Sequence, residues 1–386
     1  PVKIKKSSAN TVVTKDNRMY SLANAEFTLT YTGVAGDPLN GKSYKLHVDG
    51  NGDSETVEVA PGSYQVSETT APNGYKAVEP FSWGIFPSTN GVQEIPVADE
   101  PIYGTLNSLV DKIVDPVYQT SRPTEGAELT VNYYDSPEPE ENAKQTWVIK
   151  TTRDANGKYT AALDKAHLVS GSLTYGENVV PLGCVTVQET KEPEGFELNS
   201  TVWKMQIQQS GNGVMYSSTS QPEFQSAPVD PEELKEIPTF GDLKLGKISE
   251  EQGKTPDGDA TFKGAVFEVI NANDFDVVLH TAPDKAIHPG EVATTITTGD
   301  DGTGQTTGNL LQTGKYTVRE KTAPEGYTLS DKPLSVTIVK KQLADYSKTD
   351  PHANLPQRAG FRFRKKDLEL AEQLCTLTDK TGAEFR

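Results

Sequence analysis

One short pattern occurs three times along this chain, at residues 64–75, 185–196 and 316–327. Each copy contains Val-x-Glu in an alternating segment and ends, a few residues later, in Pro-x-Gly followed by an aromatic residue. Proline fixes its φ and glycine permits a positive one, so this ending predicts a turn that closes a strand. Because a domain-sized interval separates the copies, the 386 residues are predicted to form three domains of about 100 to 150 residues each.

The composition favours strands over helices. The chain has 32 glycines, 25 prolines and many Val, Thr and Tyr residues, which is typical of short strands joined by turns. We therefore predict an all-β protein of tandem Ig-like β-sandwich domains in an elongated row. The net charge of −17 argues against a nucleic-acid-binding surface, which needs clustered Lys and Arg. The two cysteines, Cys184 and Cys375, fall far apart and cannot build a disulfide framework or a Cys-rich metal site.

The glutamate of each repeat is predicted to face a core. In the first copy Tyr64, Val66 and Glu68 alternate along one strand, so their side chains share a face. Glu189 and Glu320 hold the same position in the second and third copies. The sequence thus predicts one inward-facing carboxyl group per domain.

Two lysines follow the same alternation on strands that open domains. Residues 2–6 place Lys6 on the side of their apolar residues, and residues 243–247 do the same for Lys247. Burial disfavours the ammonium form, so such a lysine must be neutral, paired or consumed by reaction. The alternative is that both lysines lie on a charged surface and that the glutamates are only hydrogen-bonded structural carboxylates.

These motifs resemble the CnaB-type, or SpaA-like, prealbumin-like domains of Gram-positive pilins and surface adhesins. The resemblance covers nearly the whole chain and implies that a lysine of the first strand and an Asn or Asp of the last strand form an amide bond, assisted by the core-facing Glu. Carried over residue by residue, it implies two cross-linking sites, Lys6 with Glu68 and Asp99, and Lys247 with Glu320 and Asn354.

The second domain departs from the family pattern. An ungapped alignment from the domain junction places Val110 opposite Lys6 and Lys247, whereas Lys112 lies two residues further on the same face. The last-strand position holds Glu236, where the family has Asn or Asp. Lys112 remains a candidate for a cross-link with an unassigned acceptor, and Glu189 is either its assisting group or a hydrogen-bonded core carboxyl.

Pro-containing junctions that align with one another set the predicted boundaries. They give domains at residues 1–102, 103–240 and 241–356, and a motif at 382–385 that repeats a domain-opening strand makes 357–386 the truncated start of a fourth. The short connections predict stiff packing from end to end. No signal peptide or membrane-spanning stretch is visible, so we expect a fragment of a larger protein with no direct membrane insertion.

The resemblance implies a structural stalk of a cell-wall adhesin or pilus, extracellular and on the surface of a Gram-positive bacterium. It implies no enzyme beyond a bond that forms once per site, and neighbouring domains of the same large surface protein as partners. One alternative is a binding module for a host extracellular-matrix protein or glycan, through second-domain insertions at 135–141 and 169–181. The other is a string of accessory domains from a large secreted enzyme.

Other motifs carry no site. Residues 36–43 match the P-loop expression, but an alternating strand-like segment follows where a phosphate loop needs a helix. Residues 49–53 begin like a calcium loop and lack its later ligands. The five histidines are scattered. We therefore expect neither a cofactor nor a metal.

Overall fold

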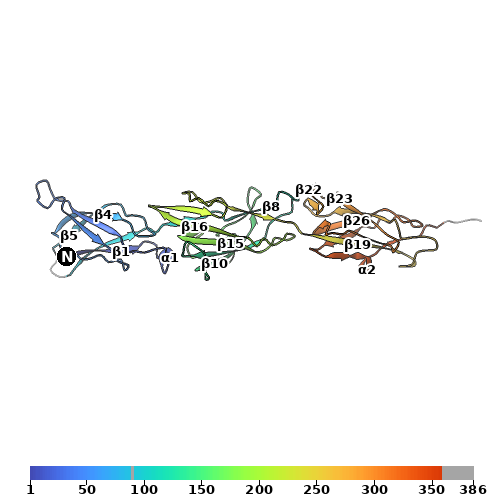
Figure 1. The fold of residues 1–386 in the computed structure, drawn as a ribbon, viewed down its shortest axis with the longest axis horizontal. Coiled ribbons are helices and arrows are strands. Elements are labelled where there is room, and N and C mark those ends of the chain that lie inside the picture. The colour runs from blue at the N-terminus through green and yellow to red at the C-terminus, as the bar shows by residue number, and fades with distance from the viewer. Residues whose placement is uncertain (88–90, 359–386) are drawn as a thin grey trace, which may run out of the picture.

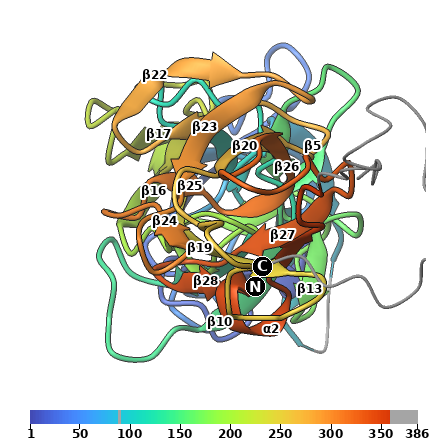
Figure 2. The ribbon, with the colours of Figure 1, turned by 90° about the vertical axis from the view of Figure 1, so that its right-hand side faces the viewer.

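The computed structural model describes residues 1–87 and 91–358. Three β-sandwiches lie one after another along a single axis (Figure 1). Seen from the right-hand end, the third domain stands in front of the other two (Figure 2). The protein is nearly all-β, as predicted, and the expected fourth-domain segment at 357–386 lies almost entirely outside the described residues.

In the first domain, residues 1–87 and 91–102 contain six strands and one short helix. They are β1 (Val2–Ser8), α1 (Thr11–Thr14), β2 (Glu26–Tyr31), β3 (Ser43–His47), β4 (Gly62–Thr70), β5 (Phe81–Ile85) and β6 (Gln93–Asp99). One sheet has the order β3-β2-β4-β5, and β1 pairs with β6 in the other. Alternate residues of both sheets, such as Ile4 and Phe27, are fully buried and form the core between them.

The second domain is larger. Its strands are β7 (Tyr103–Thr105), β8 (Val110–Val114), β9 (Glu128–Tyr134), β10 (Gln145–Lys150), β11 (Thr152–Arg153), β12 (Tyr159–Ala161), β13 (Leu168–Ser170), β14 (Val179–Pro181), β15 (Gly183–Lys191), β16 (Val202–Ser210), β17 (Gly213–Ser218) and β18 (Glu232–Glu236). The main sheet has the order β13-β10-β9-β15-β16-β17 and faces a second sheet, β11-β12-β8-β18.

The third domain repeats this plan. Its elements are β19 (Phe240–Ser249), β20 (Val266–Asn271), β21 (Val277–Leu279), β22 (Ala282–Ile287), β23 (Val292–Thr297), β24 (Thr303–Gln305), β25 (Leu311–Gln312), β26 (Gly314–Thr322), β27 (Leu334–Ile338), β28 (Leu343–Asp345), α2 (Tyr346–Thr349) and β29 (His352–Asn354). The sheet β23-β20-β26-β27 packs against the layer built around β19 (Figure 2).

In every domain the first long strand runs parallel to the last one. β1 pairs with β6, β8 with β18, and β19 with β29. The two strands therefore leave the domain in the same direction, side by side. This arrangement brings residues from the two ends of each domain's sequence into contact.

One hydrogen-bonded turn recurs at each domain end. The aromatic residue that closes the repeat forms a β-bridge with the junction proline, pairing Tyr75 with Pro101, Phe196 with Pro238 and Tyr327 with Pro356. Each repeat's glycine has a positive φ and accepts a backbone hydrogen bond from the residue after that proline. The junctions are thus built into the folded domains, which explains the row of Figure 1.

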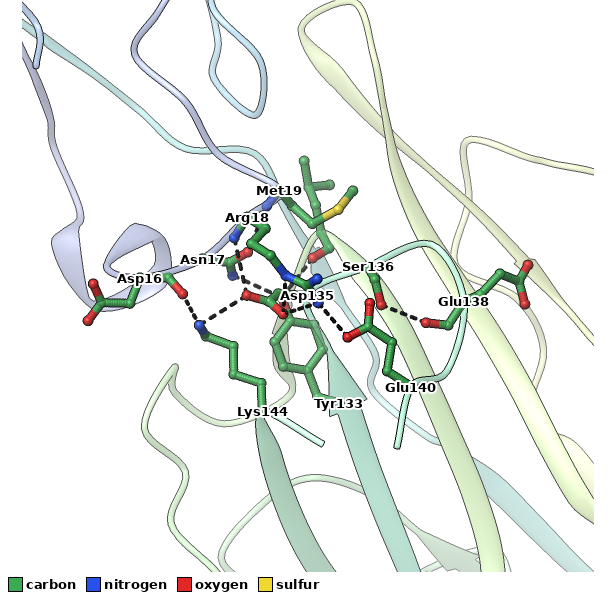
Figure 3. Close-up of polar contacts among 11 residues, drawn as sticks. Asp16, Asn17, Arg18, Met19, Tyr133, Asp135, Ser136, Glu138, Glu140 and Lys144 are labelled. Carbon is green, nitrogen blue, oxygen red and sulfur yellow. Dashed lines mark hydrogen bonds and ion pairs between the residues drawn. The ribbon is translucent and has the colours of Figure 1, made fainter. Parts of the chain in front are cut away.

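The connection between β1 and β2 extends from the first domain onto the second (Figure 3). Arg18 donates to Oδ1 of Asp135 at 2.9 Å and to Glu140 at 2.8 Å. Lys144 donates to Oδ2 of Asp135 at 3.1 Å, and the side-chain amide of Asn17 donates to the Tyr133 hydroxyl at 2.9 Å. The 135–141 insertion of the second domain, which sequence analysis offered as a ligand loop, is thus occupied in part by contacts with the first domain.

Apolar packing continues through the same junction. Tyr20 and Ile102 belong to one buried cluster with the core of the second domain. The Tyr20 hydroxyl donates to the Ile102 carbonyl at 2.6 Å and accepts from the Leu182 backbone N–H at 3.0 Å. A shared core with satisfied polar groups stabilises the packing of the first domain against the second.

The second and third domains are joined through Arg122, which is 8% exposed. Its guanidinium donates to the carbonyl of Thr313 in the third domain at 2.5 Å and to the carbonyl of Glu194 at 2.7 Å. The guanidinium also lies 5.0 Å from the ring centroid of Phe275. A buried guanidinium shared by both domains resists bending at this junction.

Within residues 1–87 and 91–358 no helix is long and apolar enough to cross a membrane.

Candidate cross-linking sites

Each domain buries one lysine amine between two polar side chains. The lysine belongs to the domain's first long strand, and its partners come from the repeat strand (β4, β15 or β26) and from the last strand (β6, β18 or β29). We call these three clusters the first, second and third lysine clusters. Because the parallel pairing joins the two terminal strands, each cluster lies where a bond would tie both ends of its domain together.

In the first cluster Nζ of Lys6 lies 2.5 Å from Oε1 of Glu68 and 2.5 Å from Oδ2 of Asp99. All three side chains have no solvent exposure. The other Glu68 oxygen accepts the backbone N–H of Val78 at 2.8 Å, which fixes the carboxyl group. The structure thus brings together the three residues that sequence analysis selected here.

The approach of Lys6 to Asp99 is unlike an ordinary ion pair. Despite the short distance, neither Asp99 oxygen accepts a hydrogen bond from any described residue. The short distance places the Lys6 amine within reach of the Asp99 carboxyl group. Burial raises the pKa of Asp99 to about 6, although contact with Lys6 opposes this shift.

In the third cluster Lys247 donates to Oε1 of Glu320 at 2.9 Å and contacts Oδ1 of Asn354. The Asn354 amide nitrogen donates to Oε2 of Glu320 at 2.7 Å and to the Thr328 carbonyl at 2.8 Å. Ser330 donates its backbone N–H to Oε2 of Glu320 at 2.9 Å, as Val78 does to Glu68. Glu320 therefore contacts both the nucleophile and the group that would leave as ammonia.

The third cluster favours an uncharged amine. Burial lowers the pKa of Lys247, against the opposing effect of its hydrogen bond with Glu320. Nζ of Lys247 also lies 5.5 Å from the ring centroid of Phe267, a contact that attracts an ammonium and so opposes the effect of burial; Nζ of Lys6 lies 4.7 Å from the ring centroid of Phe27. Lys6 and Lys247 are 2% and 4% exposed, so the interpretation that they are surface lysines is wrong.

In the second cluster Lys112, Glu189 and Glu236 come together. Nζ of Lys112 contacts one oxygen of each carboxyl group, and all three side chains have no solvent exposure. Sequence analysis named Lys112 and Glu189 here but left the acceptor unassigned, although it noted Glu236 at the last-strand position. The parallel pairing of β8 with β18 places Glu236 beside Lys112.

The ungapped alignment that placed Val110 at the lysine position was wrong. In the third domain, β19 runs unbroken from the junction to Lys247. In the second domain the corresponding segment is split into β7 and β8, and residues 106–109 between them add two residues. This insertion keeps the lysine on the same face, because side chains repeat every two residues along a strand.

The three clusters hold the kinds of group from which an amide can form, an amine beside a carboxyl or carboxamide group and a glutamate. A buried neutral amine is a nucleophile, and a protonated glutamate can polarise a carbonyl group and carry protons. Among residues 1–87 and 91–358 no group of three His, Cys, Asp or Glu side chains is placed to hold a metal ion.

Comparison with known proteins identifies the fold. The sequence model of SpaA, described as a prealbumin-like fold domain, matches residues 3–100, 115–221 and 241–352, one match in each of the three domains. No curated protein sequence matches the chain.

Three solved structures illustrate the similarity. The Bacillus anthracis TIE protein is 17% identical with a TM-score of 0.52, over 92% of this chain and 50% of that one, so the chain spans about half its length. BcpA, the major pilin subunit of Bacillus cereus, is 16% identical with a TM-score of 0.33, over 92% and 99%. A streptococcal ancillary pilin is 14% identical with a TM-score of 0.30, over 93% and 99%. At these identities the TIE protein supports the fold alone.

Proposed function

Because the chain belongs to the family of SpaA prealbumin-like fold domains, we propose that it is a segment of a structural stalk in an adhesin or pilus protein on the surface of a Gram-positive bacterium. The observation that carries this proposal is a lysine cluster in each domain, placed where the two terminal strands run side by side. Its partners are the neighbouring domains of the same surface protein.

In this proposal the first and third clusters each form a covalent amide cross-link within their domain, and we call these cross-links the lock. The Lys6 amine attacks the side-chain carboxyl carbon of protonated Asp99. A C–N bond forms there, the C–OH bond breaks, and one water leaves. In the third domain the Lys247 amine displaces the amide nitrogen of Asn354 as ammonia. The protonated Glu68 and Glu320 polarise the acceptor carbonyl group and relay a proton from the attacking nitrogen to the leaving group. Each site reacts once, so the protein does not turn over a substrate.

Such bonds suit a molecule that bears tension. The amide would join β1 to β6 and β19 to β29, which are hydrogen-bonded neighbours. A pull on the two ends of a domain would then load a covalent bond before it could separate the sheets. The buried contacts at both junctions continue the same stiffness between domains.

Intact-mass measurement with peptide mapping tests the lock. We expect a Lys6–Asp99 linked peptide lacking one water and a Lys247–Asn354 linked peptide lacking one ammonia. Unmodified peptides at both positions would refute the covalent part of the proposal and leave a stalk held by buried ion pairs and hydrogen bonds.

A further inference from the structure

We propose that the second domain is also locked, through an amide bond between Lys112 and the side-chain carboxyl group of Glu236, an acceptor with one more methylene group than Asp or Asn. This inference rests on the proposed function, because it assumes that buried lysine clusters of this kind react. It assigns a modification site where the sequence departs from its own repeat.

The strand register places Glu236 at the acceptor position. In the parallel pairs, Asp99 lies opposite Ser8, Glu236 opposite Val114 and Asn354 opposite Ser249. Each of these opposing residues follows its lysine by two positions. The stagger between lysine and acceptor is therefore identical in all three domains, even though the acceptor residue differs.

The register of the repeat strand is equally constant. Glu68 lies opposite Phe27, Glu320 opposite Phe267, and Glu189 opposite Leu129. Glu189 is therefore the counterpart of the assisting glutamates, and Glu236 is the counterpart of Asp99 and Asn354. The two carboxyl groups that contact Lys112 therefore have different roles in the proposal: Glu236 is the acceptor and Glu189 is the assisting group.

The side chain that faces the lysine amine is smaller in the second cluster, which leaves room for the longer acceptor. In the first and third clusters a phenylalanine ring lies within 5.5 Å of the amine. In the second domain this position is held by the smaller, fully buried Leu129. Since protein interiors are close-packed, a smaller residue at this position leaves space for the additional methylene group of Glu236.

The charges also favour reaction over a permanent ion pair. One ammonium between two ionised carboxylates would bury an uncompensated negative charge, which a site without solvent exposure disfavours strongly. A proton held on one carboxyl group removes that charge. Burial, opposed by Lys112 and assisted by the neighbouring Glu189, raises the pKa of Glu236 to about 7.

The assisting group is less restrained here than in the other domains. Glu68 and Glu320 each accept a backbone N–H with the oxygen that does not contact the lysine. Oε1 of Glu189 and Oε2 of Glu236 have no hydrogen-bond partner among the described residues. If Lys112 and Glu236 react, the hydroxyl oxygen of the Glu236 acid leaves as water. If they do not react, the buried cluster keeps two oxygen atoms without hydrogen-bond partners, which costs free energy.

The reaction balances without a redox partner. The Lys112 nitrogen forms a bond to the Glu236 side-chain carbonyl carbon, and the C–OH bond breaks. Glu189 takes a proton from the nitrogen and passes it to the departing hydroxyl, which leaves as water. The product links β8 to β18, so that all three domains would carry a bond between parallel terminal strands.

The test is peptide mapping of the full chain by mass spectrometry. We expect a linked peptide with Lys112 joined to Glu236 and one water missing. A free Lys112, or a link to Glu189, would overturn the assignment. If the Lys6–Asp99 and Lys247–Asn354 links are found while Lys112 is free, this inference fails alone; if all three lysines are free, the proposed lock fails with it.

Two matched variants identify the acceptor chemically. In E236Q the leaving group becomes ammonia, so the linked peptide should lack one ammonia in place of one water. In E189Q the acceptor is unchanged and the assisting carboxylate is lost, so the yield of linked peptide should fall at least tenfold. Loss of water in E236Q, or loss of ammonia in E189Q, would make Glu189 the acceptor and contradict the proposal. Retained fluorescence of the buried Trp147 and Trp203 confirms that each variant folds.

Discussion

A buried lysine amine can persist only if it is neutral, paired or covalently consumed, and the three clusters differ in how they meet this condition. Lys6 faces two carboxyl groups, and Lys247 faces one carboxyl group and one amide. Lys112 faces two glutamates. The identity of the acceptor decides whether water or ammonia leaves, whereas the repeat glutamate supplies the same proton-carrying group each time.

Replacement of Glu320 by alanine should leave Lys247 unjoined. The variant loses the group that contacts both the Lys247 amine and the Asn354 amide. The third domain should then retain one ammonia and lose about 4 to 5 kcal/mol of stability, the contribution of closing a loop of about 100 residues. Intact mass and urea unfolding measure the two effects. E325A, at an exposed residue of the following turn, is the control, and a cross-linked E320A would contradict the assisting role.

A K112M variant should reveal the ionisation of Glu236. With Lys112 in place, burial raises the pKa of Glu236 from 4.5 to about 7, and Lys112 opposes that shift. Without Lys112 the folded state should therefore hold, between those values, a proton that the unfolded state has released. The free energy of unfolding should therefore be greatest below about pH 4.5 and fall by about 1.4 kcal/mol per pH unit as the pH rises toward 7.

Tryptophan fluorescence during urea unfolding measures this slope in a W83F background, because two of the chain's three tryptophans, Trp147 and Trp203, then report on the second domain. The double variant K112M/E236Q lacks the ionisable group and should show a flatter profile. Equal slopes in the two variants would contradict the shifted pKa.

At the scale of elements, the repeat turn does more than end a strand. The glycine of each turn has a positive φ, and an added Cβ would collide with a residue of the same domain's first connection: Tyr20 at Gly74, Arg122 at Gly195 and Ala260 at Gly326. In the first two domains that connection reaches the next domain. The turn therefore holds the connection in place against the junction.

G195A and G126A separate backbone strain from this collision. Gly195 and Gly126 have φ values of +84° and +80°, but a Cβ at Gly195 would meet the Arg122 guanidinium and one at Gly126 would meet nothing within 4 Å. G126A should cost about 1 to 2 kcal/mol from the left-handed backbone alone. G195A should cost more, since Arg122 must also leave its acceptors in the junction. Equal losses in thermal unfolding would show that Arg122 moves aside freely.

At the scale of the whole molecule, stiffness depends on contacts that cross domain boundaries. Asp135 accepts from Arg18 of the first domain and from Lys144 of the second. Glu268 accepts from Arg319 and Lys321 within the third domain and has a similar side-chain exposure, 10% against 11%. The two carboxyl groups can therefore be compared directly: the contacts of Asp135 cross a domain boundary, whereas those of Glu268 stay within one domain.

D135A should loosen the first junction, whereas E268A should not. Small-angle X-ray scattering of the full chain is expected to show a broader range of end-to-end lengths for D135A and the unchanged rod for E268A. A D135A variant as straight as the unmodified protein would mean that the apolar contacts around Tyr20 hold the junction alone.

Acid should act on the same contact. Burial alone would raise the pKa of Asp135, but the hydrogen bonds from Arg18 and Lys144 hold it below its ordinary value of 3.8. An acid with a lowered pKa contributes its contact above that range and loses it as the pH falls through the lowered value. As the pH falls below the ordinary value of 3.8, scattering curves should therefore approach those of D135A, and unchanged curves would show that this carboxylate does not hold the junction.

The sequence by itself determined the domain repeat, the all-β class and the clusters of the first and third domains. Alternation along a strand is a local property, so Lys6 and Glu68 could be assigned to a core face from their immediate neighbours. Only the tertiary structure decided the second cluster, because the break between β7 and β8 shifts the lysine by two residues and the parallel pairing with β18 brings in Glu236. The junctions, too, were decided by the fold: Arg18 and Asp135 are more than one hundred positions apart, and no periodic pattern records that they meet.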